Sequence, residues 1–113
     1  MLLKRLRLMS EFIRDFAYYA LRVHELIMSL LLLIVLGGVT IAQVENIKLG
    51  DAIYFAFITG LSIGYGDISP ETGVGKVVSV AIGLVGVLFV GLTVAIATRA
   101  LARTAKRHAE TKD

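Results

Sequence analysis

The chain has 113 residues, of which 57% belong to the hydrophobic class and 19% are charged. The mean hydropathy is +0.79. Soluble domains are about 45–50% apolar and about a quarter charged, so this composition argues against a soluble domain and against a disordered chain. The chain contains no cysteine, which excludes a secreted disulfide scaffold.

Two long uncharged stretches are suited to crossing a membrane. One has 19 residues between Glu25 and Glu45, and the other has 22 residues between Lys76 and Arg99. As helices they would be roughly 28 Å and 33 Å long, against a hydrocarbon core of about 30 Å. We therefore predict an all-α membrane protein with two transmembrane helices.

The distribution of charge predicts the orientation of the chain. Ten of its 12 Lys and Arg residues lie before the first span or beyond the second, and only two lie between the spans. By the positive-inside rule this puts both termini in the cytoplasm of a multi-pass cell-membrane protein. The segment between the spans has a net charge of −2, from Glu45, Asp51, Asp67 and Glu71 against Lys48 and Lys76. The basic ends adjoin membrane spans, so we expect the lipid bilayer and its anionic headgroups as partners rather than nucleic acid.

Residues 1–24 are expected to form an amphipathic helix at the cytoplasmic membrane surface. Apolar residues recur there at three- and four-residue spacing: Leu2, Leu6, Met9, Phe12, Ile13, Phe16 and Ala20. Charged residues, Asp15 among them, fall mostly on the other side. Such a helix buries its apolar face at the acyl boundary. The alternative is a plain cytoplasmic extension of the first span.

The outer transmembrane helix is predicted at about residues 26–44, within a pore domain of residues 25–99. Gly37 and Gly38 near its outer end permit close approach of another helix. Glycine is also common in transmembrane helices in general, and that explanation stays open.

Residues 52–66 form an uncharged stretch of 15 residues that is too short to cross a membrane. We predict a short helix at about residues 51–61, followed by a non-helical return, because Gly64 and Gly66 favour dihedrals outside the helix. Irregular backbone at membrane depth must be surrounded by protein or line water. A two-span hairpin is too small to surround a re-entrant loop by itself, so it needs further copies of the chain.

The inner transmembrane helix is predicted at about residues 76–99, and it contains Gly83, Gly86 and Gly91. Residues 100–113 are rich in helix-forming residues and are expected to form a cytoplasmic helical tail.

Residues 59–67, T-G-L-S-I-G-Y-G-D, resemble the potassium-channel signature T-x-x-T-V-G-Y-G-D. The order of the predicted elements is similar to that of the two-transmembrane, pore-only potassium channels of bacterial type, and Gly75 and Lys76 resemble the start of their inner helix. The resemblance covers residues 26–99 in architecture and about residues 52–76 in sequence. It implies a homotetramer that conducts K⁺ passively, with no enzymatic activity and no cofactor other than K⁺ in the filter.

Residues 62–66 are the expected selectivity filter. A potassium ion there exchanges its hydration shell for backbone carbonyls, and Gly64 and Gly66 permit the dihedrals that turn consecutive carbonyls toward one axis. The resemblance implies K⁺ sites at the carbonyls of Ser62, Ile63, Gly64 and Tyr65, with the Ser62 hydroxyl at the innermost site. The carbonyls at the end of the preceding helix are expected to direct partial negative charge toward the pore centre.

The residues expected to support the filter are Tyr54, Phe55, Ile58, Thr59 and Asp67. Tyr54 and Phe55 stand where the family often has two Trp, and the Tyr54 hydroxyl can reach a partner such as Asp67. Other departures are Ser62 for the usual Thr, Leu61 for a frequent second Thr, and Ile58 where some relatives have Glu.

The resemblance also suggests where the channel opens. A hinge glycine is expected 20 residues after Gly66, which is Gly86, although close helix packing explains Gly83, Gly86 and Gly91 equally well. On the cytoplasmic side, Val94, Ala95 and Thr98 are expected to form an inner gate.

Two other functions remain open at this stage. A poorly selective cation channel is suggested by Ser62 and the missing Trp pair. A non-conducting membrane scaffold, with residues 62–67 as a tight external turn, is the other. No span carries an arginine at every third position, so a voltage sensor of that type is not expected.

Overall fold

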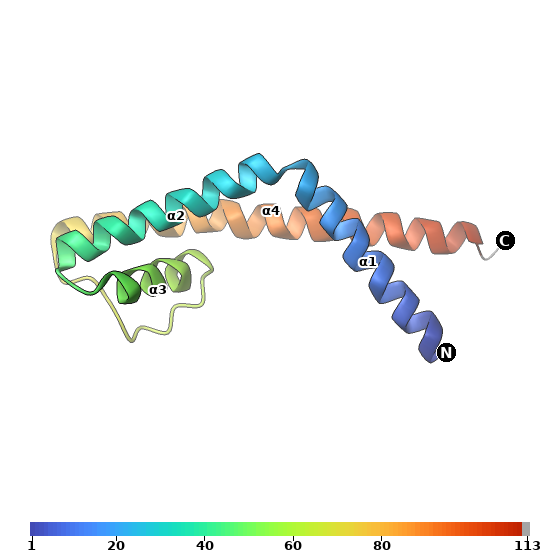
Figure 1. The fold of residues 1–113 in the computed structure, drawn as a ribbon, viewed down its shortest axis with the longest axis horizontal. Coiled ribbons are helices and arrows are strands. Elements are labelled where there is room, and N and C mark those ends of the chain that lie inside the picture. The colour runs from blue at the N-terminus through green and yellow to red at the C-terminus, as the bar shows by residue number, and fades with distance from the viewer. Residues whose placement is uncertain (112–113) are drawn as a thin grey trace. The chain divides into compact units, whose positions relative to one another are not determined.

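The computed structural model describes residues 1–111, which form four α-helices and no strand (Figure 1). The helices are α1 (Leu2–Arg22), α2 (His24–Glu45), α3 (Leu49–Gly60) and α4 (Gly73–Thr111). Lys112 and the end of the expected tail helix lie outside the described residues. The prediction of an all-α fold is confirmed.

Helices α2 and α4 are long and apolar enough to cross a membrane, and α3 is a shorter apolar helix. These are the two spans and the short helix that the sequence predicts. The inner helix and the tail were expected as separate parts that meet at residue 99. In the structure α4 runs through this position without a break, because only its charge, and not its helix propensity, changes there.

The ends of the spanning helices are held by local hydrogen bonds. Helix α2 ends at Glu45, and the next residue, Asn46, has a φ of 56° in the left-handed region that asparagine tolerates. The next N–H, that of Ile47, donates to the Ala42 carbonyl at 3.2 Å. Helix α4 starts after Thr72, whose hydroxyl accepts a hydrogen bond from the Gly75 N–H at 2.9 Å, as an N-cap residue does.

Residues Glu25–Gly91 form one compact unit, in which α2, α3 and the first part of α4 pack together. Its core joins apolar residues of all three helices: Ile34, Ile41, Ala52, Phe55, Ala56 and Ile82. A Cβ on Gly38 would lie 2.9 Å from the Ile53 side chain of α3, and one on Gly37 would meet Ile82 of α4. The two glycines therefore permit the close helix approach that the sequence predicts.

A second unit combines residues 1–24 with the chain from Leu92 onward. Within it, α1 packs against the C-terminal part of α4 through Asp15, which is only 2% exposed. The Asp15 carboxylate accepts hydrogen bonds from the Thr104 hydroxyl at 2.6 Å and from Arg107 at 3.0 Å. The sequence analysis put Asp15 on a polar face. It did not predict that this face packs against another helix, because the partners of Asp15 lie about 90 residues later in the chain.

The apolar residues of the first turns of α1 stay exposed, among them Leu3 at 82% and Met9 at 60%. An unpartnered apolar face on an amphipathic helix is what burial at a membrane surface requires. The interfacial position of α1 stays a prediction.

Candidate functional site

The expected filter segment begins at a left-handed cap on the end of α3. Ser62 has a φ of 63°, and its N–H donates to the Thr59 carbonyl at 3.2 Å. The Ile63 N–H donates to the Ile58 carbonyl at 3.0 Å. This pair of bonds, with a left-handed residue between the helix and the second donor, is a common helix C-terminal motif. The motif ends α3 and sets the direction in which the segment leaves it.

Left-handed dihedrals occur at every second residue of this segment. The φ angles are 63° at Ser62, 60° at Gly64 and 80° at Gly66. A Cβ added to either glycine would meet no atom within 4 Å in this chain, so the backbone conformation is the reason for glycine there. Ser62 adopts such a conformation with a Cβ, at a cost of roughly 1–2 kcal/mol. The sequence analysis expected the two glycines and missed Ser62.

The carbonyl groups of the segment are left without partners in the chain. Across the described residues 1–111, no hydrogen bond is accepted by the backbone oxygens of residues 62–66. The segment is also exposed, with Ile63 at 49% and Tyr65 at 71%. Carbonyl oxygens at membrane depth need a polar partner, because hydrocarbon offers no hydrogen-bond donor. For this segment the partner has to come from outside the chain's own hydrogen bonds.

The carbonyls at the end of α3 bond to the start of the filter segment. The Ile58 carbonyl accepts from the N–H groups of Ile63 and Gly64, at 3.0 Å and 3.2 Å, and the Thr59 carbonyl accepts from Ser62. Ile58 and Thr59, which were expected to support the filter, therefore hold the segment through their backbone carbonyls. The N–H groups of the segment satisfy carbonyls that the end of α3 would otherwise leave without partners. The expectation that this helix end directs partial negative charge at a pore centre stays a prediction.

The aromatic pair of α3 divides into two roles. The Tyr54 hydroxyl donates a hydrogen bond to the Asp67 carboxylate at 3.1 Å, which is the bond the sequence predicts. Phe55 is 7% exposed and belongs to the core with α2 and α4. The outer end of the segment is thus fastened to α3 by one side-chain bond, and its inner end by the backbone bonds of the cap.

Glu45, at the end of α2, was not expected to take part. Its carboxylate accepts hydrogen bonds from the N–H groups of Glu71 at 2.6 Å and Thr72 at 3.1 Å, and also from the Thr72 hydroxyl. One side chain thus ties the loop after the filter segment to α2 and to the start of α4. The Thr72 cap could have been found from its position before the inner helix, but the distant Glu45 partner could not.

No cluster of three or more His, Cys, Asp or Glu side chains among residues 1–111 is arranged to hold a metal ion.

Comparison with known proteins decides the family. A family model described as "Ion channel" matches residues 28–103, which include α3, the filter segment and most of both spans. The chain belongs to the ion channel family. It is therefore a membrane protein and not an enzyme, and the predicted membership of the two-transmembrane channel group is confirmed.

Several relatives of this channel are named as potassium channels. A voltage-gated potassium channel of Aeropyrum pernix is 34% identical over 74 residues, covering 59% of this chain and 25% of the relative. A protein of Rhodopseudomonas palustris named as a potassium channel protein is 36% identical over 58 residues, covering 51% and 14%. A two pore potassium channel of Oryza sativa is 40% identical over 56 residues, covering 50% and 12%. The channel thus spans a quarter or less of the length of these relatives. No solved structure matches.

The expected hinge, Gly86, is a contact point in this channel. A Cβ on Gly86 would overlap the Gly60 carbonyl and Cα at the end of α3, so only glycine allows α4 to approach α3 there. Gly83 and Gly91 have no atom within 4 Å of an added Cβ. Close packing therefore accounts for Gly86 as it stands, and its hinge role stays a prediction.

The expected gate residues lie on an exposed part of α4. Val94 is 57% exposed, and the Thr98 hydroxyl donates to the Val94 carbonyl at 2.8 Å. Val94 and Thr98 are each two residues away from Ile96, which is buried on the side of α4 that faces α1. Two residues correspond to a rotation of about 200° around the helix axis, so both side chains lie on the opposite side of α4. Ala95 is at the edge of the side that faces α1. The gate assignment of these residues stays a prediction.

Proposed function

We propose that this chain is the subunit of a potassium-selective channel, in which the carbonyls of residues 62–66 bind K⁺. The observation that carries the proposal is the exposed filter segment, with left-handed dihedrals at alternate residues and carbonyls that accept no hydrogen bond within residues 1–111. Rings of backbone carbonyls replace the hydration shell of K⁺ in channel filters. The names of the relatives support K⁺ as the ion.

One segment supplies oxygens from one side only, so an ion needs further copies around it. We infer a homotetramer, with four filter segments around a common axis. Gly83 and Gly91, in the apolar part of α4, face open space and would permit close approach of a neighbouring subunit.

In the proposed arrangement both termini are cytoplasmic and the channel lies in the cell membrane. The basic residues outside the spans support this orientation, and they favour contact with anionic lipids. The loop around Asp67 and Glu71 would then face outside, where its negative charge raises the local concentration of cations.

A poorly selective cation channel is the second candidate. Ser62, held in a strained left-handed conformation in place of the usual Thr, is the observation in its favour. The hydroxyl and both glycines are retained, however, and the Tyr54–Asp67 bond fastens the outer end of the segment. These features favour a defined filter.

The test is the reversal potential of the purified protein in planar bilayers, with opposing K⁺ and Na⁺ gradients and Ba²⁺ as a blocker. We expect a potential close to the K⁺ equilibrium value and block by Ba²⁺. Gly64→Ala should abolish selective current, because a Cβ opposes the dihedral at that position. Gly50→Ala is the matched control, since a Cβ there also meets no atom within 4 Å but the residue has an ordinary φ.

Clear currents with a potential near zero would replace the proposal with the poorly selective channel. Selective K⁺ current that survives in Gly64→Ala would show that residues 62–66 are not the filter.

A further inference from the structure

The C-terminal part of α4 carries two basic residues in line with one of the expected gate residues. Ala95, Arg99, Ala102 and Lys106 follow one another at spacings of four, three and four residues, so they share one side of the helix. All four are exposed. The side of α4 that carries Ala95 thus continues beyond the span as a stripe with two cationic side chains.

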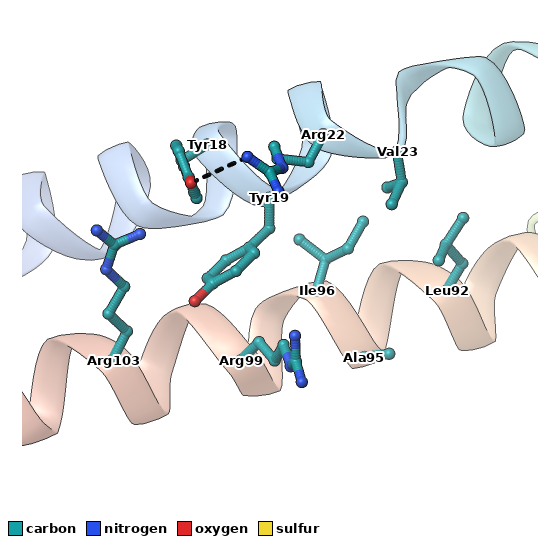
Figure 2. A pocket seen from close by; sticks show the side chains of 9 residues that line it. All are labelled: Tyr18, Tyr19, Arg22, Val23, Leu92, Ala95, Ile96, Arg99 and Arg103. Atoms are coloured by element: carbon teal, nitrogen blue, oxygen red, sulfur yellow. Dashed lines mark hydrogen bonds between the residues drawn. The ribbon is translucent and has the colours of Figure 1, made fainter.

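The two basic residues of this stripe are not neutralised within the chain. Among residues 1–111, neither Arg99 nor Lys106 belongs to an ion pair, and no acidic side chain lines the hollows that they border between α1 and α4. Arg103 differs, because it lies 3.9 Å from the Asp15 carboxylate and 4.8 Å from the centre of the Tyr18 ring. Figure 2 shows the difference, with Arg103 extending from α4 toward Tyr18 and Arg99 staying alongside α4.

The sign of this charge is opposite to that at the other end of the span. Arg99 is the first charged residue after the 22 uncharged residues of the inner span. The only acidic residue of α4 is Glu110, one turn after Lys106, and among the described residues it forms no ion pair. The loop before α4 carries Asp67 and Glu71 instead. Rings of acidic side chains are typical of cation channels, and rings of Arg and Lys are typical of anion pores.

We propose that Arg99 and Lys106 lower the cation concentration at the cytoplasmic entrance, and so limit the entry of K⁺ and, more strongly, of divalent cations from that side. The inference rests on the proposed function, since four copies of each residue surround the entrance only in the tetramer with cytoplasmic termini. The local concentration of an ion falls exponentially with its charge times the potential. A potential that halves the concentration of K⁺ therefore lowers that of a divalent cation about fourfold.

The test is single-channel recording in excised inside-out patches, which fix the orientation of the protein, with equal K⁺ on both sides and Ba²⁺ added to the cytoplasmic bath. At about 0.1 M salt the Debye length is about 10 Å. Under these conditions Arg99→Gln/Lys106→Gln should raise the outward single-channel current about twofold and the affinity for cytoplasmic Ba²⁺ about fourfold. Both differences should disappear at about 1 M salt, where the Debye length is about 3 Å. Arg99→Lys keeps the charge and should behave as the unmodified protein.

The matched control is Lys4→Gln/Arg5→Gln, which removes the same charge from exposed positions on α1 and should change neither quantity. An unchanged outward current in the α4 variant would overturn the inference. Equal factors for K⁺ and Ba²⁺ would also overturn it, because a rearranged entrance, unlike a change in potential, does not act according to ion charge.

The reversal potential under K⁺ and Na⁺ gradients tests the proposed function separately. A channel that does not select K⁺ but shows both effects of the α4 variant would keep this inference and lose K⁺ selectivity. A selective channel without these effects would do the reverse. A protein that passes no cation would overturn both.

Discussion

At the scale of single residues, Asp15 is the most constrained ionisable group outside the spans. Its pKa is lowered below the ordinary value of 3.8 by the hydrogen bond from Thr104, and further by Arg107 and Arg103, while burial acts in the opposite direction. A carboxylate with a lowered pKa in the folded state stabilises it at all pH values above the pKa of the unfolded chain, about 3.9. That contribution disappears as the pH falls through the folded-state pKa.

We therefore expect the packing of α1 on α4 to be constant from pH 8 to pH 5 and to weaken below about pH 4. Amide hydrogen exchange of residues 2–22, corrected for the intrinsic effect of pH, measures this directly. In Asp15→Asn the protection should be lower at neutral pH and should not change at acidic pH, because the titrating group is gone.

The control for this prediction is Glu11→Gln. Glu11 contacts His108 at 2.7 Å across the same two helices, so its substitution removes a second carboxylate contact between them and leaves Asp15 in place. The Glu11 variant should keep the acid-induced loss of protection. An acid-induced loss in Asp15→Asn as large as in the unmodified protein would mean that another group is responsible.

At the scale of elements, the contact between α3 and α4 depends on Gly86. A hinge glycine and a contact glycine respond oppositely to alanine. A glycine needed only for bending would gain about 1 kcal/mol of helix stability on replacement. At Gly86 the new Cβ would instead overlap the backbone of Gly60, and overpacking of this kind costs about 1–3 kcal/mol.

We expect Gly86→Ala to lower the free energy of unfolding in mixed micelles by about 1–3 kcal/mol. Gly83→Ala is the control from the same helix, because its Cβ meets no atom of the chain within 4 Å, and it should have no such effect. A Gly86 variant as stable as the Gly83 variant would restore the hinge explanation.

The elements themselves were largely predictable from the sequence. Uncharged length, flanking charge and glycine placement locate the two spans and α3, since membrane insertion depends on just these quantities. The bond between Tyr54 and Asp67 was also predicted, because the resemblance places Tyr54 at an aromatic position on the helix that precedes the filter segment. The left-handed Ser62 was missed, since glycine is the usual residue at that position of a helix end.

Two further misses have a different cause. Glu45 bonds to residues 26 and 27 positions later, and Asp15 to residues 89 and 92 positions later. A periodic pattern indicates which face of a helix is polar but not which distant helix will supply partners. Asp15 therefore has the sequence pattern of a solvent-facing residue, although two helices enclose it.

At the scale of the whole molecule, a single chain leaves much of α4 uncovered. Val77, Val80 and Leu84 follow one another at three- and four-residue spacing and are each at least 65% exposed. Lipid or other subunits must cover them. The proposed function sets a stricter requirement, because the carbonyls of the filter segment would then bind a cation that one chain cannot surround.

This requirement links assembly to the ion. If K⁺ binds only between four filter segments, it stabilises the tetramer and not the separate chains. At a concentration a hundredfold above its Kd, such an ion adds about 2.7 kcal/mol. We therefore expect crosslinking in mild detergent to give a tetramer of the 12.2 kDa chain, with a higher thermal dissociation midpoint in K⁺ than in Na⁺ at equal ionic strength.

The variants of the filter separate this effect from general salt effects. Gly64→Ala should remove the difference between the K⁺ and Na⁺ midpoints, whereas Gly50→Ala should keep it, because only the first substitution changes a left-handed residue of the filter. A dimer as the largest species would contradict the four-fold arrangement. Equal midpoints in the two salts would mean that the carbonyls of residues 62–66 do not distinguish K⁺ from Na⁺, even if the tetramer forms.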